Sequence, residues 1–230
     1  MSSANDSVER SSDACELCGD VAVAGTVLSI DYMTRGRKEA AARNIRVHLD
    51  GSRLFNAAAA LGVNTKALTA LADTVAVSLN KGLAAPLGAI LAGSRDVIER
   101  AVTVRHRWGG SWRPASIPAA AALVALDTMV DRIGDDHVTA RELAGGLAAI
   151  DGLAIDPTQV QTNIVLVDLA ERLGKSEEFA ARLSEGGVLA LPFGTHRLRL
   201  VTWHEITSRD VAHAIDVFQQ AAKAGIRRSA

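Results

Sequence analysis

Short runs rich in β-branched residues alternate with helical segments along this chain, and this alternation constrains its fold more than any other feature. Strand-like runs occur at residues 45–50 (IRVHLD), 75–80 (VAVSLN) and 161–169 (QTNIVLVDL). The segments between such runs carry apolar residues at helical spacing, and Thr207 opens the last of them as a capping residue. Strands that alternate with helices predict an α/β architecture.

The same patterns place the remaining elements. We expect strands at residues 25–30 and 88–94, with the second one buried, and a helix from Asp31 to Asn44. An alanine-rich helix is expected over residues 115–133, and another helix is expected to open at Thr139.

The domain organisation follows from shifts in composition. Residues 1–22 are rich in Ser, Asp and Glu, which predicts a disordered polar tail. Its two thiols, Cys15 and Cys18, lack the second pair of ligands that a zinc site needs. We expect a larger domain over residues 23–130 and a smaller α/β domain over residues 131–230.

Bulk composition excludes several classes of partner. The 230-residue chain is 48% apolar and carries a formal net charge of −1, which argues against electrostatic capture of nucleic acid. No apolar run approaches the roughly 20 residues that a membrane-spanning helix needs, so no membrane partner is expected. The polar start has no apolar core of a signal peptide, and we therefore expect a cytoplasmic location.

Two charged residues follow successive predicted strands. Asp50 ends the run IRVHLD, and Lys81 ends the run VAVSLNK. An acid and a lysine placed in this way can grip pyridoxal phosphate (PLP), the acid at the pyridine nitrogen and the lysine at the aldehyde. From the residues alone, the commoner interpretation is a helix-capping aspartate and a solvated surface lysine.

Five separated strings favour the cofactor interpretation. They are IRVHLDGSRLFNAAAALGV, SLNKGLAAPLGAILAGS, GGSWRPASIPAAAALVAL, QTNIVLVDL and RLRLVT. In this order they resemble the threonine aldolase / aromatic amino acid β-eliminating lyase family of fold-type-I PLP enzymes. The resemblance implies a partial fold-type-I PLP-dependent transferase-like fold, with an incomplete large-domain sheet and a smaller C-terminal α/β domain.

The resemblance also implies a role for each matching residue. Asp50 would hold the pyridine nitrogen, and Arg53 would lie near the phenolic oxygen of the cofactor. Lys81 would form the Schiff base, and cationic surroundings with partial burial would lower its pKa. Arg113 would reach the cofactor phosphate of a neighbouring subunit, and Arg199 would clamp the substrate carboxylate.

Other polar residues receive simpler interpretations. His48 lies two residues before Asp50, so a strand points both side chains to one face, and we interpret it as a packed histidine that supports the site. His137 is assigned to surface or packing, because the histidines show no metal-ligand spacing. Asn163 fits the family's TN string as a structural turn residue. Trp203 stands where the family has histidine.

The function implied by the resemblance is a PLP-dependent lyase of the threonine aldolase type. It would cleave β-hydroxy-α-amino acids to glycine and an aldehyde, in a homo-oligomer (a dimer or tetramer) with active sites at subunit interfaces. About 44 residues precede IRVHLD, so no glycine-rich phosphate cradle is expected, and a sheet edge is expected to lie uncovered. Two alternatives follow: a truncated, inactive homologue or partner subunit, and a PLP lyase of the β-elimination type.

Overall fold

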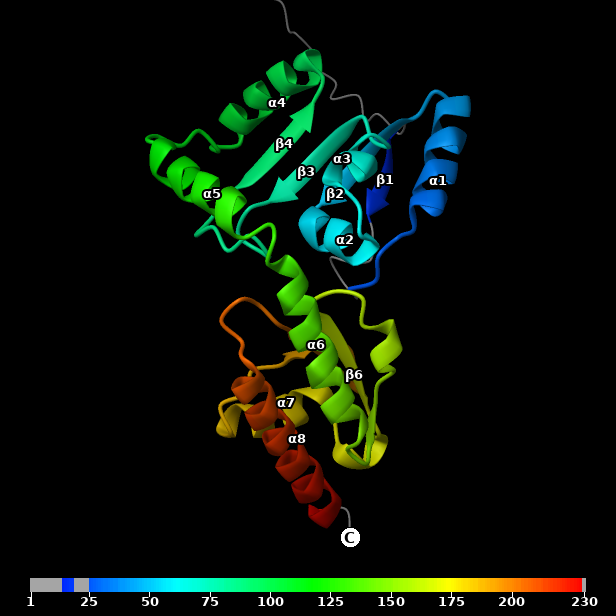
Figure 1. The fold of residues 1–230 in the computed structure, drawn as a ribbon, viewed down its shortest axis with the longest axis vertical. Helices are drawn as coiled ribbons and strands as arrows, with labels where there is room; N and C mark the ends of the chain where they lie inside the picture. Colours follow the sequence, from blue (N-terminus) through cyan, green and yellow to red (C-terminus); the bar gives the residue numbers. More distant parts are fainter. Residues whose placement is uncertain (1–13, 19–24, 229–230) are drawn as a thin grey trace, which may run out of the picture.

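The computed structural model describes residues 14–18 and 25–228. These residues form two lobes, each built on its own four-stranded sheet, with helix α6 running from the junction into the second lobe (Figure 1). In the part of the chain that the structure describes, no helix combines the length and the apolar character needed to cross a bilayer.

The sheet of the first lobe is mostly parallel. Its strands lie in chain order, with β1, β2 and β3 parallel and β4 antiparallel to β3. Because β2 and β3 run in the same direction, the residues that follow them meet at one edge of the sheet. The four strands are β1 (Ala14–Cys18), β2 (Arg46–Gly51), β3 (Thr74–Ser78) and β4 (Ala89–Gly93).

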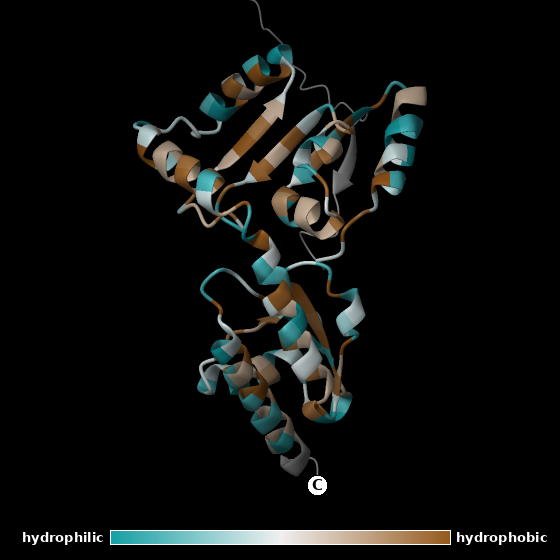
Figure 2. Cartoon of the chain, in the orientation of Figure 1, coloured by the Kyte–Doolittle hydropathy of each residue, from teal (hydrophilic) through white to brown (hydrophobic). Residues whose placement is uncertain are grey.

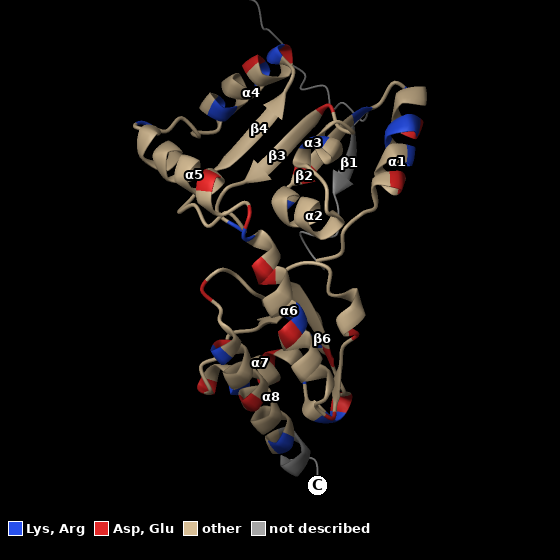
Figure 3. Cartoon of the chain, viewed as in Figure 1, with Lys and Arg blue, Asp and Glu red and all other residues tan. Residues whose placement is uncertain are grey.

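Local capping fixes the starts of the first-lobe helices. The Ser29 hydroxyl accepts a hydrogen bond from the Tyr32 amide, and Asn64 Oδ1 accepts one from the Lys66 amide. Figure 3 shows charged residues on α1 and α4, whereas β3 and β4 carry none along their lengths. The helices are α1 (Ile30–Ala42), α2 (Leu54–Leu61), α3 (Thr65–Thr69), α4 (Arg95–Arg107) and α5 (Ser116–Thr128).

The second lobe is an antiparallel sheet covered by helices. Its strand order is β5-β6-β8-β7, and its core includes Phe179 and Phe218, whose ring centroids lie 5.8 Å apart. The strands are β5 (Leu153–Ala154), β6 (Ile164–Leu169), β7 (Leu191–Pro192) and β8 (Arg197–Val201). The helices are α6 (Ile133–Ala148), α7 (Ser176–Glu185) and α8 (Ser208–Arg228), with single 3₁₀ turns at Pro157–Gln159 and Glu171–Leu173.

The segment expected as a strand over residues 25–30 is instead an irregular connection that ends in the cap of α1. Gly25 has a left-handed φ of 80°. The backbone groups of this segment bond to the second lobe: the Gly25 carbonyl accepts from the Thr162 hydroxyl at 2.8 Å, and the Val27 amide donates to Gln161 Oε1 at 2.6 Å. These bonds replace the strand ladder that the β-branched composition predicted.

Part of the predicted polar tail is also ordered as a strand. Ala14–Cys18 form β1, which pairs with β2 over five residues and covers the sheet edge expected to be open. The rest of the predicted tail, together with the side chains of Cys15 and Cys18, lies outside the described residues. Backbone pairing needs no particular side chain, and Glu16 is the one charged residue in Ala14–Cys18, so this part of the predicted tail can add a strand.

Two further expectations differ from the structure. The strand over residues 88–94 is present as β4 but is exposed along its whole length, and Figure 2 shows it as largely hydrophobic. The helix expected over residues 115–133 ends at Thr128, and α6 begins at Ile133 rather than at Thr139. Thr139 lies inside α6, where its hydroxyl donates to the Asp135 carbonyl one turn back.

Candidate active site

Asp50 lies near the carboxyl end of β2. Burial alternates along this strand, with Val47 and Leu49 in the core and His48 and Asp50 on the opposite face. The Ser52 hydroxyl and the Ser52 amide both donate to Asp50 Oδ1, at 2.7 and 2.9 Å. The hydroxyl bond most strongly lowers the pKa of the Asp50 carboxyl, and partial burial opposes it.

Lys81 lies three residues past the end of β3, at the same edge of the sheet as Asp50. Its positive charge, together with that of His48, further lowers the pKa of the Asp50 carboxyl, so the two side chains lie within electrostatic reach of each other. Lys81 is exposed, so the partial burial expected from the sequence is not found. The structure therefore brings the predicted acid and the predicted lysine together.

Two arginines from different lobes lie close to each other beside this pair. Arg53 precedes α2, and Arg199 lies on β8 of the second lobe. Burial lowers the pKa of Arg53 to about 10, with a further contribution from the positive charge of Arg199. Partial burial also lowers the pKa of Arg199. Two partly buried guanidinium groups that lie this close form a favourable place for an anion.

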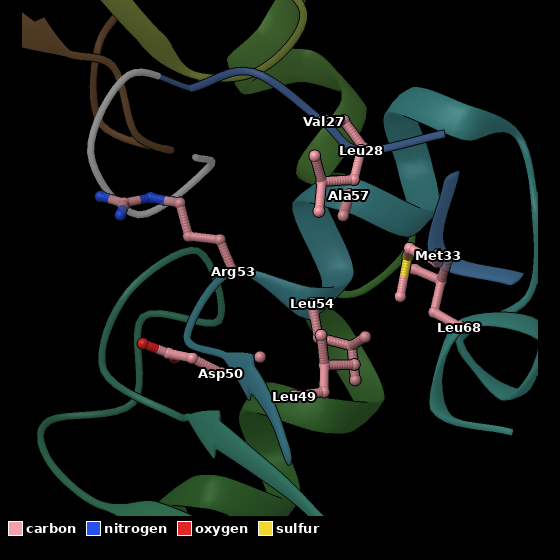
Figure 4. Close-up of a pocket in the computed structure, with 10 residues that line it drawn as sticks. Val27, Leu28, Met33, Leu49, Asp50, Arg53, Leu54, Ala57 and Leu68 are labelled. Carbon is pink, nitrogen blue, oxygen red and sulfur yellow. The ribbon is translucent and has the colours of Figure 1, made fainter. Parts of the chain in front are cut away.

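The side chains of Asp50 and Arg53 point away from an apolar cavity behind them. Figure 4 shows both directed to one side of β2 and α2, with Met33, Leu54 and Leu68 on the other side. The cavity holds about 40 Å³, whereas pockets for small molecules measure roughly 300–1,000 Å³. It is therefore packing space, and a ligand would bind on the polar side of Asp50.

Arg113 is the one predicted site residue that the structure leaves outside this group. It is exposed in the connection between α4 and α5, which lies at the outer edge of the first lobe in Figure 1. The structure thus gathers Asp50, Lys81, Arg53 and Arg199, and it separates Arg113 from them. In the described part of the chain, no three His, Cys, Asp or Glu side chains are grouped to bind a metal ion.

Several residues that support the candidate site had no clear signal in the sequence. Thr74 on β3 fixes His48, with 2.7 Å between its hydroxyl and His48 Nδ1, which agrees with a packed supporting histidine. Asn56 on α2 is 1% exposed and contacts three other segments of the junction. Asn56 bonds to partners that lie 81 and 107 positions further along the chain. No periodic pattern in the sequence indicates contacts at such a separation.

Comparison with known proteins gives consistent results. Residues 17–171 match the family model described as Beta-eliminating lyase. The chain is 39% identical over 199 residues to Low-specificity L-threonine aldolase 1 of Arabidopsis thaliana, covering 86% of this chain and 55% of that protein. It therefore spans about half the length of this curated relative.

Solved structures give the same fold at lower identity. Threonine aldolase of Leishmania major superimposes with a TM-score of 0.70 at 15% identity, over 91% of this chain and 61% of that chain. A structure of SPT with PLP superimposes with a TM-score of 0.64 at 22% identity, over 92% of this chain and 55% of that chain. The predicted α/β fold of the fold-type-I kind is confirmed by these matches.

Proposed function

The chain belongs to the beta-eliminating lyase family, and from that premise we propose that it is a PLP-dependent lyase of the threonine aldolase type. Its proposed substrates are β-hydroxy-α-amino acids, which it would cleave to glycine and an aldehyde. The observation that carries the proposal is the meeting of Asp50 and Lys81 at the carboxyl edge of the first sheet. This is the edge at which open α/β sheets bind their ligands.

The residues at this edge fit PLP at three of its chemical features. The lowered pKa of Asp50 gives a carboxylate suited to a protonated ring nitrogen. Lys81 supplies an exposed amine for the aldehyde, and Arg53 supplies a cation for the phenolic oxygen. When bound, PLP provides an electron sink for the pair of electrons left on the substrate Cα after the Cα–Cβ bond breaks.

The chain's own residues would orient the substrate. Arg199 would hold the α-carboxylate with two parallel N–H donors, and nearby Arg53 would add positive charge. His48, on the same face of β2 as Asp50, is held in place by the Thr74 hydroxyl, which lies 2.7 Å from its Nδ1 atom. Asp50 would remain ionised at neutral pH, because its bonds to Ser52 lower its pKa.

We also propose that the protein is a homo-oligomer, with Arg113 of one copy serving the phosphate of another. Two features of the first lobe support this. Arg113 is exposed at the outer edge of the lobe, and α4 has no buried residue. Large apolar side chains on α4, α5 and their connection are exposed, with Trp108 at 87% and Ile117 at 73%. Patches of this kind mark surfaces that pair with another protein.

Titration with PLP tests the cofactor site. The visible spectrum of the wild type should gain a band shifted from that of free PLP, and Lys81→Ala should abolish the shift. Lys66→Ala is the matched control, since Lys66 is an exposed lysine of the same lobe on α3. Identical spectra for wild type and Lys81→Ala would refute the assignment of Lys81.

Product analysis then separates the candidate reactions. Incubation with threonine or allo-threonine should yield glycine and acetaldehyde if the protein is an aldolase. Ammonia and pyruvate from a β-substituted alanine, with no glycine from threonine, would instead indicate the β-elimination reaction. A protein that binds PLP through Lys81 but forms neither set of products would be an inactive homologue or a partner subunit.

A further inference from the structure

Asn56 lies at the junction of the two lobes and is almost fully buried. It belongs to α2, three residues after Arg53, and is 1% exposed. Figure 1 shows α2 close to the first turns of α6, where the two lobes meet. A buried primary amide must satisfy two donors and one acceptor, so its neighbours show what it holds.

The Nδ2 atom of Asn56 bonds to two elements of the second lobe. It lies 3.1 Å from Nε2 of His137 on α6 and 3.4 Å from Oδ1 of Asn163, just before β6. His137 is 3% exposed, and burial, with a further contribution from Arg141, lowers its pKa to about 4. The ring is therefore neutral at pH 7, and its Nε2 can accept the hydrogen bond from Asn56.

The Oδ1 atom of Asn56 lies against the residue that follows Lys81. A Cβ atom added to Gly82 would sit 2.7 Å from this oxygen, well inside van der Waals contact. The loop that carries Lys81 is therefore pressed onto the amide of Asn56. Only glycine allows so close an approach at this position.

Asn163 extends the connection to the strand that carries Arg199. Its Nδ2 donates to the Thr202 carbonyl at 2.8 Å, and the Thr202 amide donates to the Asn163 carbonyl at 2.9 Å. The Thr202 hydroxyl in turn donates to the Asp136 carbonyl on α6 at 2.6 Å. Thr202 follows Arg199 by three positions, so this network fixes the end of β8.

We propose that Asn56 is a positioning residue that holds the Lys81 loop, the start of α2 with Arg53, and the end of β8 with Arg199 in one fixed arrangement. The inference rests on the proposed function in one respect, since Lys81, Arg53 and Arg199 are the residues proposed to bind the cofactor and the substrate. Asn56 is buried and is assigned no direct contact with the cofactor or the substrate. It acts by joining the two lobes at the point where the site is divided between them.

Hydrogen exchange of the full chain without cofactor tests the positioning directly. The reporters are the Ala84 and Ala85 amides, which bond to the Lys81 and Leu79 carbonyls, and the Thr202 amide. Asn56→Ala should accelerate exchange at all three reporters by about ten-fold, the change in an opening equilibrium that about 1.4 kcal/mol produces. It should also weaken the apparent affinity for PLP by a similar factor.

Thr162→Val is the matched control. It removes one fully buried hydrogen bond at the same lobe junction, to the Gly25 carbonyl, without touching Gly82 or Thr202. It should leave exchange at the three reporters within about two-fold of the wild type. Equal acceleration by Thr162→Val, or acceleration by Asn56→Ala confined to α2, would overturn the proposal.

A second pair of variants decides the matter if Asn56→Ala does not fold. His137→Leu removes the acceptor for Asn56 Nδ2 and should accelerate the reporters, whereas His137→Gln retains an acceptor and should restore slow exchange. Similar exchange for both variants would overturn the proposal. If wild type fails to bind PLP, the proposed function fails, and the exchange experiment still decides the role of Asn56.

Discussion

The two lobes differ in how completely each one buries its own apolar residues. In the second lobe, helices α6, α7 and α8 and the antiparallel sheet enclose one continuous core that includes Phe179, Leu198 and Phe218, each 0% exposed. The first lobe has two smaller clusters, one around β2 and α2 and the other around Leu83 and Ala122, which the first residue of α6 joins. Its strand β4 and helix α4 have no buried residue.

The lobe with the more complete core is not the lobe that carries most of the proposed site. The second lobe is packed as a self-sufficient unit, and its contribution to the site is Arg199 at the end of one strand. The first lobe carries Asp50, Arg53 and Lys81 and leaves a large apolar surface exposed. The lobe with the incomplete core is thus the lobe with most of the proposed site, and it is the lobe whose exposed surface we propose to pair with a second copy.

Truncating one aromatic residue in each lobe should give the largest contrast. Phe218→Ala removes a ring that is 0% exposed and should lower the free energy of unfolding by roughly 3–5 kcal/mol. Trp108→Ala removes a ring that is 87% exposed and should change it by no more than about 0.5 kcal/mol. Urea unfolding followed by circular dichroism measures both. A large loss for Trp108→Ala at low protein concentration would contradict the contrast.

Trp108→Ala also tests the apolar surface itself. If the exposed apolar surface of α4 and α5 pairs with a second copy, the substitution should shift the protein toward monomer in sedimentation velocity. Phe179→Ala, measured under conditions in which circular dichroism shows that it remains folded, should not cause this shift. Wild type that remains monomeric at high concentration would contradict the oligomer proposal.

Acidification should weaken the junction between the lobes through His137. The pKa of His137 is lowered to about 4 in the folded protein, against 6.5 for an unperturbed histidine. The unfolded state therefore binds more protons between these values, so this contribution to stability is complete above about pH 6.5 and falls as the pH decreases toward 4. The total loss is on the order of 3 kcal/mol.

His137→Gln provides the comparison for this pH effect. Since glutamine does not titrate, the stability difference between wild type and His137→Gln should change between pH 7 and pH 5, in the direction that disfavours the wild type at pH 5. Urea midpoints at several pH values give this difference. A constant difference across the range would show that the ring is not held neutral.

Ion pairs should give the smallest contrast between the lobes. Asp73 of the first lobe accepts from both terminal nitrogens of Arg37 on α1 and from the buried amide of Val47, so Asp73→Ala should cost roughly 2 kcal/mol. Asp168 of the second lobe pairs with Arg197 on the surface, where both side chains are about half exposed, so Asp168→Ala should cost less than about 1 kcal/mol. Thermal unfolding of both variants in low and high salt measures the contrast, and equal costs would contradict it.

The sequence was informative wherever local pattern and structure agree. The run IRVHLD predicted β2, and Thr207 as a capping residue predicted the start of α8, where the Thr207 amide donates to Asp210 at 2.9 Å. The order of β2 and β3 also sufficed to bring Asp50 and Lys81 to one edge.

The misses arose where tertiary contacts decide the local structure. Residues 25–30 have strand-like composition, yet Gly25 and Val27 bond to the second lobe instead of to a strand. The apolar residues of β4 predicted burial, but each of them is exposed in the structure. Asn56 and His137 each look ordinary in the sequence, and only folding brings them together.

In the proposed site, Lys81 is the amine that holds PLP opposite Asp50. The most direct measurement is reduction of the PLP-loaded protein with borohydride, followed by peptide mapping in a mass spectrometer. We expect a pyridoxyl-modified peptide that contains Lys81, and no such peptide from Lys81→Ala. Modification spread over other lysines such as Lys66, with Lys81 unmodified, would contradict it.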